Sequence, residues 1–145
     1  MLLTPHFTLE ELCFTSYKSY KDLNLKEAQK QMGRMYQLAG FAERVREIIG
    51  KPLIITSGFR CVKLNNAVKG AACSQHLYAE AIDFKVTGMT PLQIICELMT
   101  SDLKFQQLIA EHSGSSAWTH IGIGSKQEVL TYRNGVYTKI GEVKQ

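Results

Sequence analysis

The chain has 145 residues, 45% of them hydrophobic, which suits one compact domain and is too few for two ordinary ones. Its net charge of +4 favours polyanionic surroundings such as cell-wall polymers or nucleic acid, without identifying either. Lysine and arginine are scattered along the chain rather than gathered on one helix, which argues against nucleic-acid binding. No window is apolar enough for a membrane span, and the start, MLLTPHF, lacks the basic residues of a signal peptide. We therefore expect synthesis in the cytoplasm without a signal peptide.

The first half of the chain predicts helices. Thr8 and Glu11 have the spacing of a capping box, which predicts a short helix from residue 9. Asn24 and Glu27 repeat that spacing and predict the start of a long helix that ends at Gly50. Its core stripe has helical spacing and consists of Met32, Met35, Leu38, Ala39, Ala42, Val45 and Ile49.

The middle of the chain alternates short strands with short helices. Residues 53–56 form a β-branched apolar run that predicts a buried strand, and residues 81–86 alternate well enough for another. A short helix is expected over 61–68. Thr90 followed by Pro91 predicts the start of a further helix, because proline in the first turn costs no hydrogen bond.

From residue 105 onward the pattern predicts strands. These are expected over 105–111, 118–123, 129–132 and 136–140. Asn134-Gly135 favours a two-residue turn, so 129–140 should form a C-terminal hairpin. Helices followed by strands indicate one α+β domain over residues 1–145 with an antiparallel sheet.

The four cysteines form no CxxC pair, which excludes a zinc knuckle and a thioredoxin-like motif. A chain that can build its own core in the cytoplasm is expected to keep them reduced. They are Cys13, Cys61, Cys73 and Cys96.

Three side chains with metal-binding chemistry lie on or beside predicted strands. They are His76, Asp83 and His120. Two imidazoles and a carboxylate are a normal catalytic zinc set that leaves a fourth position for water. The alternative is structural: Asp83 caps a turn, and the two histidines are satisfied surface or core residues.

A longer pattern resembles a known family. The run ITSGFRCVKLNNAVKGAACSQHLYAEAIDF, with WTHIG about 35 residues later, is similar to the D-Ala-D-Ala carboxypeptidase-like zinc peptidases. That family includes vancomycin-resistance dipeptidases and many bacteriophage lysins, and it shares its fold with the Hedgehog signalling domain. The family motif SxHxxGxAxD is matched by Ser74, His76, Ala81 and Asp83, and the resemblance extends over residues 5–123.

The resemblance implies a Hedgehog/DD-peptidase fold, an antiparallel sheet with helices packed on one side and a zinc site on the sheet. His76, Asp83 and His120 would hold Zn²⁺. Arg60 matches the arginine that binds the carboxylate or carbonyl of the peptide, although a surface ion pair is the alternative. Ser74 would hydrogen-bond to the substrate, or only shape the loop.

Two motif positions next to these residues are also informative. Trp118 matches the aromatic residue beside the last ligand, and we expect it to contact substrate. Ala79 stands where the motif has glycine. If the turn after His76 has a positive φ, alanine is the costlier residue there, and only a minor adjustment is expected.

The general base departs from the common family pattern. Many relatives carry an acid or histidine three positions before the last ligand, where this chain has Ala117. The small phage-type branch has an acid further upstream, in a segment like QLIAE, and Glu111 matches it. A strand pairing of 105–111 with 118–123 would bring Glu111 near the metal. Glu80 is the alternative base, and His112 is a weaker substitute.

The resemblance therefore implies a zinc metallopeptidase that hydrolyses amide bonds in peptidoglycan stem peptides, as a D-amino-acid-specific carboxypeptidase or endopeptidase. A phage endolysin or a virion-associated wall hydrolase is expected, delivered by phage or released at lysis, with virion components as partners. The alternative is a non-catalytic structural or wall-binding module in which zinc only stabilises the same fold.

Overall fold

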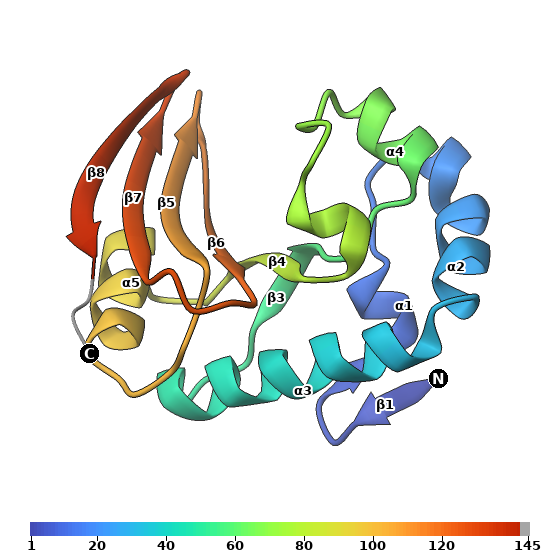
Figure 1. Cartoon of the computed structure of the whole chain (residues 1–145), viewed down its shortest axis with the longest axis horizontal. Helices are drawn as coiled ribbons and strands as arrows, with labels where there is room; N and C mark the ends of the chain where they lie inside the picture. Colours follow the sequence, from blue (N-terminus) through green and yellow to red (C-terminus); the bar gives the residue numbers. More distant parts are fainter. Residues whose placement is uncertain (143–145) are drawn as a thin grey trace. The chain divides into compact units, whose positions relative to one another are not determined.

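The computed structural model describes residues 1–142, and its helices and strands confirm the α+β fold class (Figure 1). The chain divides into two compact units. Unit 1 comprises Met1–Glu43 and Ile55–Ile82, and unit 2 comprises Arg44–Ile54 and Asp83–Gln145. The helix α3 (Met32–Ile49) and the strands β3 (Ile54–Ser57) and β4 (Ala81–Lys85) run from one unit into the other. Residues 143–145 of the predicted domain lie outside the described residues, and the single-domain organisation stays a prediction.

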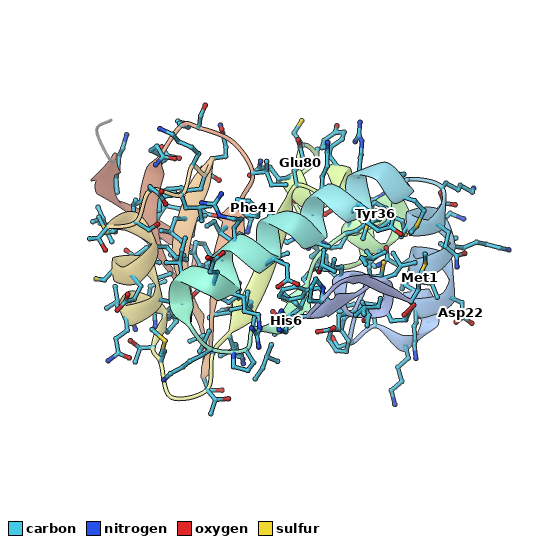
Figure 2. The ribbon with its side chains drawn as sticks, turned by 90° about the horizontal axis from the view of Figure 1, so that it is seen from below. Met1, His6, Asp22, Tyr36, Phe41 and Glu80 are labelled. Atoms are coloured by element: carbon cyan, nitrogen blue, oxygen red, sulfur yellow. The ribbon has the colours of Figure 1, made fainter. Side chains whose placement is uncertain are left out.

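Unit 1 begins with a short hairpin and a capped helix. The Thr8 hydroxyl accepts the Glu11 N–H at 3.0 Å, and the Glu11 carboxylate accepts the Thr8 N–H at 3.1 Å, which confirms the predicted capping box. His6, labelled in Figure 2, binds Glu43 of α3 through its backbone and ring nitrogens, both at 2.8 Å. Besides its parts of α3, β3 and β4, unit 1 contains β1 (Leu2–Thr4), β2 (Phe7–Thr8), α1 (Leu9–Leu12), η1 (Lys18–Tyr20), α2 (Lys21–Gln29), α4 (Val62–Ala67) and η2 (Gln75–Tyr78).

The predicted helix start at Asn24 is wrong. The helix α2 begins three residues earlier, at Lys21, and the chain breaks between Gln29 and Met32 before α3 begins. Asn24 lies inside α2 and is fully buried. Its amide donates to the carbonyls of Cys13 and Phe59, both at 2.9 Å, and its oxygen accepts the Cys61 N–H at 2.7 Å. Long-range hydrogen bonds, rather than local capping, explain an asparagine here.

Replacing Asn24 with alanine should lower the free energy of unfolding by about 3 kcal/mol, because three buried backbone groups lose their partner. Chemical denaturation followed by circular dichroism measures this change. Asn66→Ala, at an exposed position of α4, is the control and should leave stability nearly unchanged. Equal midpoints for both variants would show that Asn24 does not anchor these segments.

Unit 2 contains the remaining helix and most of the sheet. The helix α3 ends at Gly50, whose φ of 75° confirms the predicted C-terminal glycine. Thr90 and Gln93 form a capping box with hydrogen bonds of 3.2 and 2.9 Å, so α5 (Pro91–Met99) begins where predicted. The strands that follow are β5 (Gln107–Ser113), β6 (Ser116–Gly122), β7 (Glu128–Arg133) and β8 (Val136–Glu142).

The sheet is not wholly antiparallel, which corrects the prediction. Its strand order is β3-β4-β6-β5-β7-β8. β5 pairs antiparallel with β6 but parallel with β7, because the hairpin strand β6 takes the other edge of β5. β7 and β8 form the predicted antiparallel hairpin, with φ values of 47° at Asn134 and 92° at Gly135. Positive φ at both turn residues is typical of the type I′ turn that this dipeptide favours.

The two faces of β5 and β6 have different environments. Leu108, Ala110, Thr119 and Ile121 alternate onto one face and are fully buried. The helix α5 packs against β5 and β6 and buries its own Ile94, Ile95 and Leu98 (Figure 1). Glu111, Trp118 and His120 alternate onto the opposite face and remain partly exposed. This opposite face of unit 2 carries the candidate catalytic residues.

Candidate metal and substrate site

The first predicted ligand, His76, is held in unit 1 by local hydrogen bonds. It lies in the one-turn helix η2, where the Ser74 hydroxyl accepts its backbone N–H at 3.2 Å. Its buried ring places Nδ1 2.7 Å from the Gly58 carbonyl oxygen. A carbonyl only accepts, so Nδ1 carries the proton and the lone pair is on Nε2. Metal-binding histidines are commonly oriented in this way.

The loop that carries Gly58 is fixed from its other side by α1. A Cβ atom on Gly58 would lie 2.3 Å from the Leu12 carbonyl oxygen, so no side chain fits there. The Phe59 N–H donates to the same oxygen at 2.8 Å. Glycine is therefore required in the SGFR segment for a close backbone approach.

The predicted substrate arginine lies beside His76 and Ser74 in unit 1. The Arg60 backbone N–H donates to the His76 carbonyl at 3.0 Å. Its guanidinium Nη2 lies 3.5 Å from the Ser74 hydroxyl oxygen. The structure thus brings together three of the residues that the motif assigns to the site.

Ala79 adopts the left-handed conformation that the family glycine would favour. Its φ is 55° and its ψ is 40°, and its side chain is buried at the end of η2. This conformation is unfavourable by about 1–2 kcal/mol for a residue with a Cβ atom. The turn after His76 therefore does need a positive φ, and this chain forms it with alanine.

The other two predicted ligands contact each other in unit 2. His120 Nδ1 lies 2.9 Å from Asp83 Oδ1, and the side chains are 13% and 15% exposed. Two donors of a tetrahedral zinc ion with bonds of about 2.0–2.1 Å lie about 3.3 Å apart. The observed separation is close to that distance, so this pair fits one metal ion with little rearrangement.

The donor chemistry also fits zinc. His76 of unit 1 offers an imidazole, and Asp83 and His120 of unit 2 offer a carboxylate and a second imidazole. Nitrogen and carboxylate oxygen are the ligands of catalytic zinc, and three protein donors leave a coordination position for water.

The predicted general base lies on the same sheet face as His120. β5 and β6 pair with Glu111 opposite Trp118, as the predicted pairing requires. His120 is then the diagonal neighbour of Glu111, and such neighbours lie about 7–8 Å apart, within reach of long side chains. The Trp118 indole Nε1–H donates to Glu111 Oε2 at 2.7 Å. This bond fixes the carboxylate, a role for Trp118 that the sequence did not predict.

The two alternative bases lie elsewhere. His112 follows Glu111 along β5, so its side chain alternates onto the opposite face of the sheet. Glu80 belongs to unit 1, where it is exposed just after η2 (Figure 2). Of these acids and histidines, Glu111 has the local geometry within unit 2 that a base beside His120 needs.

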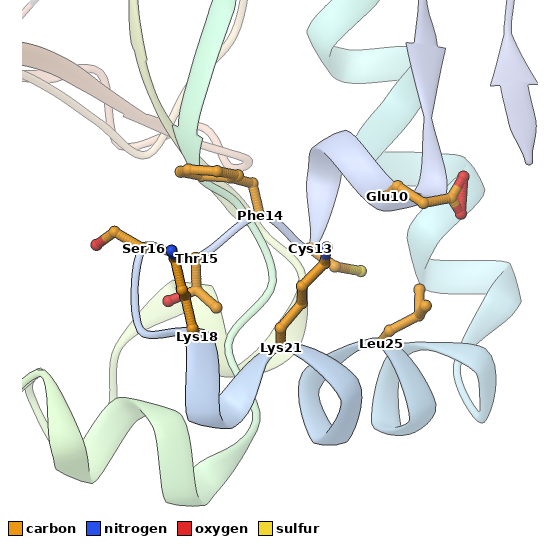
Figure 3. A pocket seen from close by; sticks show the side chains of 8 residues that line it. All are labelled: Glu10, Cys13, Phe14, Thr15, Ser16, Lys18, Lys21 and Leu25. Atoms are coloured by element: carbon orange, nitrogen blue, oxygen red, sulfur yellow. The ribbon is translucent and has the colours of Figure 1, made fainter.

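A separate pocket lies in unit 1, with a volume of about 400 Å³ (Figure 3). Its lining consists of Glu10, Cys13, Phe14, Thr15, Ser16, Lys18, Lys21 and Leu25, and includes none of the predicted site residues. Burial, and then the charge of Glu10, raise the pKa of the Cys13 thiol to about 12. The thiol therefore stays protonated near neutral pH and is a poor nucleophile.

The chain was also compared with known proteins. The sequence model of the Peptidase M15 family matches residues 5–122. No curated protein matches the chain significantly. No helix within residues 1–142 is both long and apolar enough to cross a membrane. Because the match includes all three proposed ligands and the strands that carry Glu111 and Trp118, the chain belongs to the M15 family of zinc D-Ala-D-Ala carboxypeptidase-like peptidases.

Proposed function

We propose that this protein is a zinc peptidase that hydrolyses amide bonds in peptidoglycan stem peptides, at a bond involving a D-amino acid. His76, Asp83 and His120 would hold the zinc ion. The observation that carries the proposal is the Asp83–His120 pair, with Glu111 as its neighbour on the same sheet face. Membership of the M15 family supports the reaction class.

The side chains have separate tasks in this reaction. When bound, zinc acts as a Lewis acid that polarises the scissile carbonyl and activates water. Glu111 accepts the proton of the attacking water and delivers it to the leaving amine. Trp118 holds the Glu111 carboxylate through its indole N–H at 2.7 Å. Arg60 binds a carboxylate or carbonyl of the peptide through its guanidinium, and Ser74 adds a hydrogen bond.

The phage-type pattern of the sequence supports a proposal for the biological setting. We propose that the protein is a phage endolysin or a virion-associated wall hydrolase, released at lysis or delivered with virion components. Its net charge of +4 favours attraction to anionic wall polymers. A Hedgehog/DD-peptidase arrangement, with the zinc site on the sheet, belongs to the same proposal.

The zinc-loaded protein should release new amino groups from purified peptidoglycan. Removal of zinc with a chelator should abolish the release of amino groups, and added zinc should restore it. The reason is that the bound ion, and not its protein ligands, activates the attacking water. Amino groups are counted with an amine-reactive dye, with zinc content measured in parallel. If fully loaded protein is inert on several wall types, the non-catalytic wall-binding module becomes the better description.

A further inference from the structure

Four side chains form a row across four strands of unit 2. Glu111 of β5 is paired with Trp118 of β6 on one side and with Tyr132 of β7 on the other, and Tyr132 is paired with Tyr137 of β8. Directly paired residues project from the same face of a sheet, so this four-strand row shares one face. His120 lies on that face too, two residues after Trp118.

Side-chain contacts confirm the row at both ends. Trp118 hydrogen-bonds to Glu111, and the rings of Tyr132 and Tyr137 contact each other with centroids 4.7 Å apart at an angle of 58°. Tyr137 is 58% exposed, so its ring is accessible to a bound molecule. The two tyrosines thus continue the surface that begins at the proposed base.

The phenol of Tyr137 is influenced by the charges of candidate catalytic residues. Burial raises the pKa of its phenol, and negative charge on Glu111, Tyr132 and Asp83 raises it further. Glu111 and Asp83 therefore lie within electrostatic range of the phenol. Tyr137 and Tyr132 lie beyond the family match, which ends at residue 122, so membership of the family gives them no role.

We propose that Tyr132 and Tyr137 bind the peptide substrate, holding a segment of it against their rings beside Glu111. Tyrosine suits this task because its rigid, amphipathic ring offers a large contact area and loses little conformational entropy on binding. The proposal rests on the proposed peptidase function. It makes the β7–β8 hairpin a specificity element attached to the catalytic sheet.

The test uses the full zinc-loaded chain and a soluble stem pentapeptide ending in D-Ala-D-Ala. Tyr137→Ala and Tyr132→Ala should each raise KM about tenfold, with kcat nearly unchanged, because the rings contribute binding rather than chemistry. Tyr137→Phe should retain most of the affinity, because it keeps the ring. Tyr36→Ala, at a tyrosine of α3 that is 45% exposed, is the matched control and should behave as wild type.

A second measurement does not depend on turnover. In the Glu111→Gln background, calorimetry of the same peptide should show a Kd about tenfold weaker for Tyr137→Ala than for Tyr36→Ala. Circular dichroism melting verifies that each variant is folded. If wild type cleaves the peptide and both tyrosine variants match it in KM and Kd, this inference is overturned while the peptidase function stands. If zinc-loaded wild type neither binds the peptide nor releases amino groups from peptidoglycan, the peptidase function fails and the inference fails with it.

Discussion

Glu111→Gln is expected to reduce peptidoglycan hydrolysis by about 100- to 10,000-fold, the usual contribution of a general base. Glutamine has nearly the same shape as glutamate and its oxygen can still accept the Trp118 indole N–H. The variant should therefore keep its fold and its zinc, and lose only the ability to take a proton. Release of new amino groups from peptidoglycan gives the rate, and metal analysis of the same sample gives the zinc content.

Matched variants separate Glu111 from the alternative bases. Glu80→Gln changes an exposed carboxylate in unit 1, and His112→Gln changes a side chain on the opposite face of β5. Both should keep activity within a few-fold of wild type. If Glu111→Gln were active and Glu80→Gln inactive, Glu80 would be the general base. The hydrogen bond from Trp118 to Glu111 would then have no role in catalysis.

Local chemistry explains the elements that the sequence predicted well. The capping boxes at Thr8 and Thr90 and the turn at Asn134-Gly135 each depend on residues within a few positions of one another. Threonine supplies the hydroxyl that caps a helix, and asparagine and glycine readily adopt the positive φ of the turn. These signals therefore needed no knowledge of the rest of the chain.

Long-range contacts explain the elements that were missed. Asn24 has the spacing of a cap, but its three partners are 11, 35 and 37 residues away, and they place it inside a helix. The parallel pairing of β5 with β7 likewise joins strands separated by a whole intervening strand. Local sequence patterns do not predict which strands become neighbours, because loop closure and packing determine the strand order.

Only part of the candidate site could be predicted, because some of its contacts also depend on long-range strand pairing. The ligands and Glu111 came from a resemblance to a known family, since the spacing of His76, Asp83 and His120 alone left a structural explanation open. The bond from Trp118 to Glu111 requires the β5–β6 register, and the Tyr132–Tyr137 contact requires the registers of β5–β7 and β7–β8. A strand register becomes known only when the sheet is built.

His120→Ala is expected to weaken zinc binding by more than about 100-fold, so that the purified protein no longer retains about one ion per chain after dialysis. The imidazole lies 2.9 Å from Asp83, and its loss would remove one of the two donors that unit 2 supplies. A coordination sphere with only two protein ligands holds zinc poorly. Equilibrium dialysis followed by metal analysis measures the change without any assay of activity.

The control and the remaining ligand make this test specific. His112→Ala removes a histidine from the opposite face of the same sheet and should retain zinc at the wild-type level. His76→Ala removes the ligand that belongs to unit 1, and zinc loss in this variant would support one ion bound by both units. Retention of zinc by His76→Ala and His120→Ala alike would contradict the proposed ligand set. Loss in His120→Ala alone would exclude His76 from the ligand set, and His76 would then be a structural residue whose ring hydrogen-bonds to the Gly58 carbonyl.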